Sequence, residues 1–155
     1  MLRSTPSLLA VASFIALTGC MSAKTSGSAS PTAPRPQFVV PRQGTSPFSG
    51  VVRVGDLLFV AGQLGTDSNG LVKGGIGPET TAAMNNIDRL LTQAGSSMDR
   101  VAKCTVMLAD MSQWTAMNDA YMKFFPTNPP ARSSFGATAL AMGGHVEIEC
   151  IAAAG

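Results

Sequence analysis

Two charged side chains in the C-terminal part of the chain are able to do chemistry together. Arg132 opens an apolar stretch after Pro129-Pro130, and Glu147 lies in the alternating stretch Val146-Glu147-Ile148-Glu149. An arginine presents a planar pair of donors to a carboxylate, and a nearby glutamate can orient a water molecule. The same spacing also fits a solvated arginine and a glutamate on the wet face of a strand, so both interpretations stay open at this point.

The segments that must position these residues follow strand and helix patterns in alternation. Strand-like runs cover residues 50–54, 57–63, 101–108, 132–139 and 146–152, and one-faced helical patterns cover residues 78–94 and 111–125. The order ββαβαββ predicts an α+β fold with one sheet and both helices on one of its faces. Because two helices cover only that face, we expect the other face to associate with further copies of the chain.

The second predicted helix carries an apolar stripe with helical spacing. Its members are Trp114, Met117, Tyr121, Phe124 and Phe125. We expect this stripe to lie in the core rather than at a binding surface. Asn118 lies beside the stripe, where it either reaches a neighbouring surface or stays solvated.

The first 37 residues differ in composition from the rest. Residues 1–19 hold one early cation, Arg3, and an apolar run that is too short for a spanning helix and is typical of an export signal. The stretch Leu17-Thr18-Gly19-Cys20 resembles a bacterial lipobox, which predicts a lipidated Cys20 and a protein anchored in the cell envelope, facing the periplasm. Residues 20–37, rich in Ser, Thr and Pro, then form a flexible tether, and the folded domain covers residues 38–155.

The charge of the chain argues against a nucleic-acid partner. Charged residues make up only 13% of the sequence and the net charge is +2, which falls to about +1 once Arg3 leaves with the signal. A nucleic-acid-binding protein needs a broad basic surface, and this balance supplies none.

The remaining histidine and cysteines give weaker signals. His145 is the only histidine and follows Gly143-Gly144, so we expect a solvent-exposed turn residue and no metal site. Cys104 and Cys150 would pair if their strands were adjacent and they faced the same side, yet both also suit a packed interior. We expect them to be unpaired.

Four motifs, in this order, resemble the Rid (YjgF) family of enamine and imine deaminases over about residues 47–153. They are Val54-Gly55-Asp56-Leu57-Leu58-Phe59-Val60-Ala61-Gly62-Gln63, Asn118-Asp119-Ala120-Tyr121 with Phe124-Phe125, Pro130-Ala131-Arg132-Ser133, and Val146-Glu147-Ile148-Glu149. The resemblance implies a chorismate-mutase-like fold and a homotrimer with three sites at the subunit clefts. It implies hydrolysis of 2-imino acids to 2-oxo acids and ammonia, without a metal or an organic cofactor.

The resemblance also implies a role for individual residues. Arg132 would bind the substrate carboxylate and Glu147 would place the hydrolytic water. The other expected substrate-binding residues are Phe48, Ala61, Gly62, Asn118 and Ser134. Three of them depart from the common pattern, because the family usually has a tyrosine at the position of Phe48 and often has a serine at Ala61 and a cysteine at Ser134. We therefore expect a pocket rim that is more apolar than usual.

Three functions compete at this point. The first is an envelope-anchored deaminase of small 2-imino acids, and the second is a module that binds a small carboxylate or a partner without turning it over. The third, the ribonuclease activity of some relatives, fits a near-neutral chain poorly.

The lipobox predicts a specific mature N-terminus. Intact-mass analysis of protein extracted from membranes should show an acylated chain that begins at Cys20, because lipidation replaces the signal sequence at that residue. Soluble protein that carries a free Cys20 thiol would contradict the prediction.

Overall fold

The computed structural model describes residues 32–155. The predicted signal sequence, Cys20 and most of the predicted tether lie outside the described residues. None of the helices within residues 32–155 combines the length and the apolar character needed to cross a membrane.

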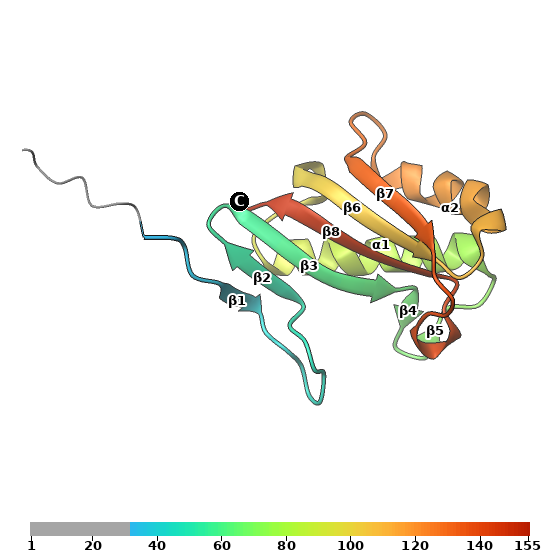
Figure 1. Ribbon diagram of the computed structural model, residues 1–155, viewed down its shortest axis with the longest axis horizontal. Helices are drawn as coiled ribbons and strands as arrows, with labels where there is room; N and C mark the ends of the chain where they lie inside the picture. Colours follow the sequence, from blue (N-terminus) through green and yellow to red (C-terminus); the bar gives the residue numbers. More distant parts are fainter. Residues whose placement is uncertain (1–31) are drawn as a thin grey trace, which may run out of the picture. The chain divides into compact units, whose positions relative to one another are not determined.

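Six strands form one mixed sheet, with the order β1-β2-β3-β8-β6-β7 (Figure 1). Neighbouring strands are antiparallel except for β6 and β7, which are parallel. The strands are β1 (Gln37–Val40), β2 (Val51–Val54), β3 (Leu57–Leu64), β6 (Val101–Leu108), β7 (Ala131–Gly136) and β8 (Val146–Ala153). Two further strands, β4 (Thr66–Asp67) and β5 (Gly70–Leu71), form a small separate ribbon.

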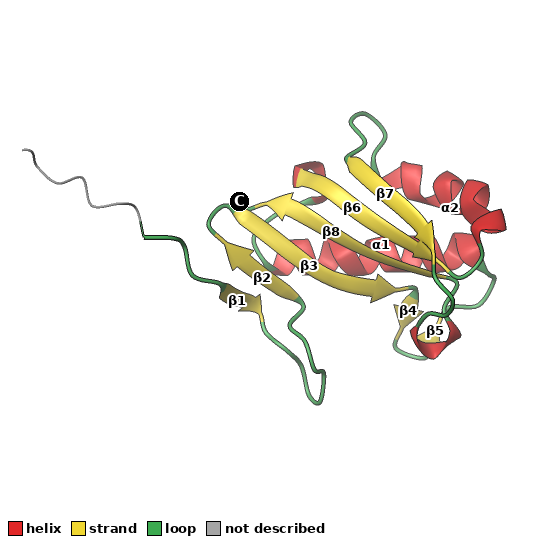
Figure 2. Cartoon of the chain, in the orientation of Figure 1, coloured by secondary structure: helices red, strands yellow, loops and turns green. Residues whose placement is uncertain are grey.

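Two helices lie on one side of this sheet, as Figure 2 shows with the helices in red and the strands in yellow. α1 (Ile76–Gln93) packs against β3 and β8, and α2 (Trp114–Tyr121) packs against α1. Gly95 follows the C-cap of α1, and its φ of 75° lets the chain turn back while Ser96 N–H donates to the carbonyl oxygen of Leu91. The α+β architecture expected from the sequence is confirmed.

The core lies between the sheet and the helices. Its fully buried members include Ile87 and Leu91 of α1, Val106 of β6 and Ile148 of β8. Side chains of a strand alternate between the two faces, so the neighbours of these strand residues point away from the helices.

The other face of the sheet is uncovered in the single chain. It presents Leu57 and Phe59 of β3 and Phe135 of β7, each more than 40% exposed. Large apolar side chains exposed on a sheet face, here together with charged residues of β6 and β8, are typical of a surface that takes part in an interface.

Several elements differ from the sequence-based expectation. β1 was not predicted, because residues 37–40 adjoin the Pro-rich stretch, and its first residue was assigned to the tether. The helix predicted over 111–125 is split into a 3₁₀ turn at Met111–Gln113, the α-helix α2, and a second 3₁₀ turn at Met122–Phe124. The hairpin of β2 and β3 forms at the predicted Gly55-Asp56 turn.

His145 is held by a buried acid, so the expectation of a free turn residue is met only in part. Its Nδ1 lies 2.5 Å from Oε1 of Glu79, and its backbone N–H donates to Oε2 of the same residue at 2.8 Å. Glu79 is 3% exposed and lies in the first turn of α1, where the helix dipole favours a negative charge. The contact fixes the segment before β8 to the start of α1.

Cys104 of β6 and Cys150 of β8 form a disulfide, so the prediction that they are unpaired is wrong. The reason is the strand register. β6 and β8 are adjacent, and the two cysteines face each other directly on the helix side of the sheet, with a Cα–Cα distance of 4.1 Å. The two residues are 46 positions apart in the sequence, which concealed their contact.

The disulfide predicts a measurable loss of stability on reduction. Peptide mapping should recover Cys104 and Cys150 in one cross-linked species, and reduction should lower the free energy of unfolding by about 2 to 4 kcal/mol because the open chain gains entropy when unfolded. Alkylation of both cysteines in denatured but unreduced protein would show that the bond is absent.

Candidate active site

Arg132 and Ser134 point toward the helix side of the sheet, at its edge. They lie on β7 opposite Cys104 and Val106 of β6, which are both buried against the helices. β7 is the last strand of the sheet, so the long side chain of Arg132 lies at the margin of the core and is only partly exposed.

Glu147 points to the opposite, uncovered face. Its neighbours in β8, Val146 and Ile148, are completely buried on the helix side, and Glu147 itself is partly exposed. β6 separates β8 from β7. A single chain therefore does not bring Arg132 and Glu147 together.

Most of the predicted residues fall into two clusters, one beside each charged side chain. We call Ala61, Gly62 and Glu147 the Glu147 cluster. Asn118, Arg132 and Ser134, joined by Tyr121, which we expected only in the core, are the Arg132 cluster. Phe48 lines a small separate cavity together with Gln63 and Leu90.

In the Glu147 cluster, Gly62 makes room for the carboxylate. A Cβ at Gly62 would overlap with Oε1 of Glu147, and it would lie 3.1 Å from Cδ. The pairing of β3 with β8 shifts between Val60 and Gln63, which places Gly62 at an irregular position of the strand. Ala61 N–H donates to the carbonyl oxygen of Gly50 at 3.0 Å, and this bond brings the Phe48 segment beside β3.

In the Arg132 cluster, the cation lies on aromatic rings instead of a carboxylate. Its guanidinium carbon is 4.8 Å from the ring centroid of Tyr121 and 5.8 Å from that of Trp114. No ion pair to Arg132 forms within residues 32–155. A partly buried cation without a counter-ion favours the binding of an anion.

Three buried polar atoms of this cluster lack a partner within the described chain: Asn118 Oδ1, Tyr121 Oη and Ser134 Oγ. Asn118 and Tyr121 line a cavity of about 320 Å³, together with Met122, Pro129, Pro130 and Arg132. Buried polar atoms are normally paired, so three orphans around one cation indicate a site that is completed by a ligand or a second chain.

We expected both Trp114 and Tyr121 in the core, but only Tyr121 is buried. Tyr121 is 1% exposed, as expected, whereas Trp114 is 42% exposed and the expectation for it is wrong. They are the first and last residues of α2, seven positions apart and thus on one side of the helix. The helical spacing of the stripe is therefore correct, but its first member lies at the surface.

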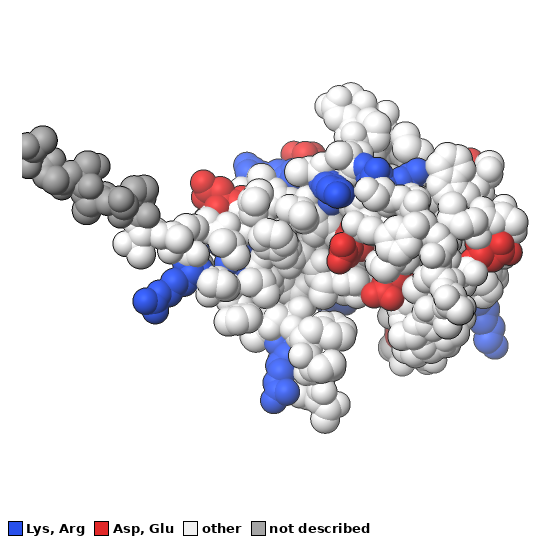
Figure 3. Space-filling model, viewed as in Figure 1, with Lys and Arg blue, Asp and Glu red and all other residues white. Residues whose placement is uncertain are grey.

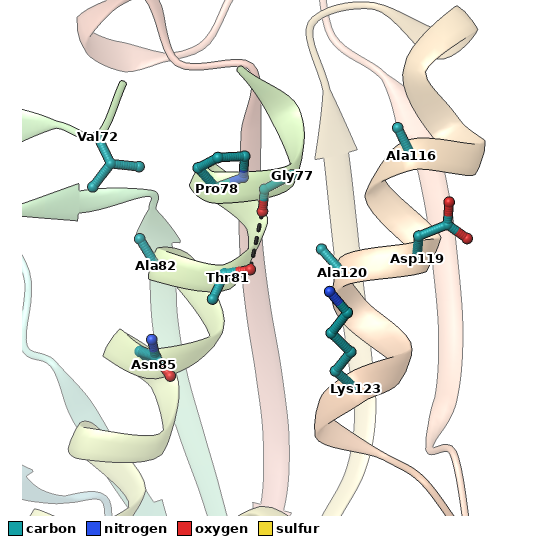
Figure 4. A pocket seen from close by; sticks show the side chains of 10 residues that line it. All are labelled: Val72, Gly77, Pro78, Thr81, Ala82, Asn85, Ala116, Asp119, Ala120 and Lys123. Atoms are coloured by element: carbon teal, nitrogen blue, oxygen red, sulfur yellow. Dashed lines mark hydrogen bonds between the residues drawn. The ribbon is translucent and has the colours of Figure 1, made fainter. Parts of the chain in front are cut away.

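A larger hollow, of about 520 Å³, lies between α1 and α2 and is separate from the predicted residues (Figure 4). Small side chains such as Ala82, Ala116 and Ala120 line it. The charged Asp119 lies on α2, and Lys123 lies on the 3₁₀ turn that follows. Thr81 donates its hydroxyl proton to the carbonyl oxygen of Gly77, so its polar group is already satisfied.

Charges are dispersed on the face that Figure 3 shows, where basic side chains lie among acidic ones and wide neutral areas separate them. This face offers no continuous basic track for a phosphate backbone.

Comparison with known proteins identifies the family of the chain. The profile of the family described as endoribonuclease L-PSP matches residues 41–154. The chain belongs to this family. Members of the family with solved structures include RidA from the Antarctic bacterium Psychrobacter sp. PAMC 21119, so the Rid (YjgF) resemblance is confirmed.

Family members of known structure and activity are similar over most of the described domain. The chain is 42% identical to 2-iminobutanoate/2-iminopropanoate deaminase from Capra hircus over 111 residues, which cover 70% of this chain and 81% of the goat protein. Psychrobacter RidA superimposes with a TM-score of 0.67 at 30% identity, covering 76% of this chain and 96% of RidA. The yeast protein YEO7 gives a TM-score of 0.69 at 33% identity, with 76% and 94% coverage.

The contact between Gly62 and Glu147 is testable by substitution. Gly62→Ala should displace the carboxylate of Glu147 to another rotamer, visible in a crystal structure of the variant, because the new methyl group would occupy its place. The free energy of unfolding should change by less than about 1 kcal/mol, since the displaced atoms are the end of a flexible side chain.

Gly77→Ala is the matched control, because a Cβ there meets open space. It should leave Glu147 in place. An unchanged rotamer of Glu147 in the Gly62→Ala structure would contradict the close contact between Gly62 and Glu147.

Proposed function

We propose that the protein hydrolyses small 2-imino acids, or their enamine tautomers, to 2-oxo acids and ammonia. Its similarity to the goat 2-iminobutanoate/2-iminopropanoate deaminase supports this reaction class. The observation that carries the proposal is Arg132, a half-buried cation at a cavity whose polar atoms have no partners in residues 32–155.

Each site is built by two protomers. The Arg132 cluster of one chain faces the Glu147 cluster of the next, because these clusters lie on opposite faces of the same sheet. The uncovered apolar face around Phe59 and Phe135 supplies a surface for this association. A closed ring of three chains would give three equivalent sites, which is the homotrimer expected from the family.

The reaction depends mainly on orienting the substrate and the attacking water, and less on activating the substrate. The imine carbon is already electrophilic, so Arg132 holds the substrate carboxylate with two parallel hydrogen bonds and fixes the carbon in place. Glu147 accepts a proton from water as the water oxygen bonds to the carbon, and the nitrogen takes up this proton, which gives a carbinolamine. The carbinolamine hydroxyl then passes its proton through Glu147 to the nitrogen, the carbon–nitrogen bond breaks, and ammonia and the 2-oxo acid leave. No electrons are exchanged and no cofactor is used.

The remaining predicted residues shape the pocket. Phe48 is 58% exposed, and in the cleft it would present a ring without a hydroxyl. Asn118 and Ser134 supply polar atoms that are unpartnered in the described chain, and Gly62 leaves the space that Glu147 occupies. The absence of hydroxyls at Phe48 and Ala61 favours substrates with apolar side chains.

The disulfide supports a location outside the cytoplasm. Structural disulfides persist in oxidising compartments such as the bacterial periplasm. Together with the lipobox at Cys20, the bond between Cys104 and Cys150 supports a lipid-anchored protein of the cell envelope, facing the periplasm.

Variants at the two charged residues should separate binding from turnover. Arg132→Ala should abolish the decay of imines generated by an amino acid oxidase and also the binding of pyruvate in calorimetry, while the protein stays folded. Arg132→Lys should recover little of either, because an ammonium lacks the planar pair of donors. Glu147→Gln should lower turnover at least about 100-fold and leave pyruvate binding nearly unchanged.

Mixing the variants tests the two-protomer site. When Arg132→Ala and Glu147→Gln chains are unfolded and reassembled together, about one quarter of the clefts should hold both intact residues and regain activity. Light scattering should show trimers in each sample. Pyruvate binding that depends on Arg132 without imine hydrolysis would replace the deaminase with a carboxylate-binding module, and full activity of Arg132→Ala would refute both.

A further inference from the structure

The guanidinium of Arg132 lies against two aromatic rings that differ in burial. Tyr121 is 1% exposed and packs against Phe125, with ring centroids 5.0 Å apart and planes inclined by 48°. This packing fixes the Tyr121 ring beneath the cation. Trp114 is 42% exposed and forms the outer contact.

Both contacts are close enough to hold the cation. The distances of 4.8 and 5.8 Å from the guanidinium carbon to the Tyr121 and Trp114 ring centroids fall within the range of about 6 Å for cation–π attraction. An arginine held in this way loses less side-chain freedom when a ligand binds, so its affinity for a carboxylate rises.

The hydroxyl of Tyr121 adds a donor beside the cation. Its Oη is buried, has no partner in the described chain, and belongs to a residue that lines the cavity next to Arg132. Burial raises the pKa of Tyr121 to about 12, against the opposing effect of the Arg132 charge, so the hydroxyl keeps its proton at neutral pH. A carboxylate on Arg132 has spare lone pairs that can accept a hydrogen bond from this hydroxyl.

We propose that Trp114 is a positioning residue that holds Arg132. Tyr121 is then a further ligand-binding residue, whose hydroxyl donates a hydrogen bond to the bound carboxylate. The assignment of that carboxylate to a 2-imino acid substrate rests on the proposed function. The aromatic support of Arg132 and the orphan hydroxyl are features of this chain by themselves.

The hydroxyl is tested with Tyr121→Phe, which keeps the ring and removes only Oη. Calorimetry should show pyruvate binding weakened about three- to tenfold, because one hydrogen bond to a charged group is lost. The ligand-free protein should melt at the same temperature as the wild type or higher, since an unpaired buried hydroxyl is removed. A purely structural role for Oη would give the reverse: a lower melting temperature with unchanged affinity.

Trp114 is tested with a pair of variants. Trp114→Leu should raise the Kd for pyruvate and the KM for imine about three- to tenfold with little change in kcat, because a cation–π contact is lost but the reacting atoms are untouched. Trp114→Phe should restore most of the affinity. Met111→Leu is the matched control, since Met111 is similarly exposed on the preceding 3₁₀ turn and should alter neither constant.

A measurement without ligand tests the contact directly, because Trp114 is the only tryptophan in the sequence. Arg132→Met should change the intensity or wavelength of its fluorescence, whereas Lys123→Met, which removes an exposed cation from the next turn, should not. Identical emission from wild type and Arg132→Met would overturn the role of Trp114.

The outcomes also separate this proposal from the proposed function. If the wild type binds pyruvate through Arg132, Trp114 and Tyr121 but does not hydrolyse imines, the proposed deaminase activity is refuted and the carboxylate-binding site stands. Imine hydrolysis with full affinity in Tyr121→Phe and Trp114→Leu would keep the deaminase and overturn this proposal. Failure of the wild type to bind pyruvate at millimolar concentration would overturn the assignment of Tyr121.

Discussion

The alternation of side chains along β6, β7 and β8 governs the rest of this structure. Because paired residues share a face, the register that buries Val106 and Ile148 also sends Arg132 toward the helices and Glu147 away from them. No rotamer change can reverse this, since the sheet itself lies between the two side chains. In the proposed site, the two charges therefore come together through a second copy of the chain.

The same register explains why a cation is tolerated beside the core. Arg132 lies level with Cys104 and Cys150 across β7, β6 and β8, in a row whose other members are buried and apolar. Its position on the edge strand lets the guanidinium reach the rings of α2 instead of entering the interior. Aromatic faces lower the cost of partial burial, but they leave the hydrogen-bond donors of the guanidinium free for a ligand.

Local patterns were sufficient for most of the fold. The limits of β6, the β2–β3 hairpin and the end of α1 just before Gly95 follow from alternation, a tight turn and a helix stop, which are all short-range signals. The disulfide and the contact between Glu79 and His145 join positions that are 46 and 66 residues apart, so no window of sequence contains them. The residues of the site were named from family motifs, and their division between two faces required the strand order.

The contact between Glu79 and His145, together with the close approach of Gly65, should make these three positions co-vary among related sequences. The carboxylate of Glu79 is almost wholly buried and satisfied by the backbone and ring of His145, and the backbone of Glu79 is so close to Gly65 that a Cβ there would clash. Loss of the histidine ring alone would leave a buried carboxylate short of a partner. Substitutions at positions 79 and 145 should therefore be inherited together, while position 65 stays glycine as long as α1 keeps its place against the sheet.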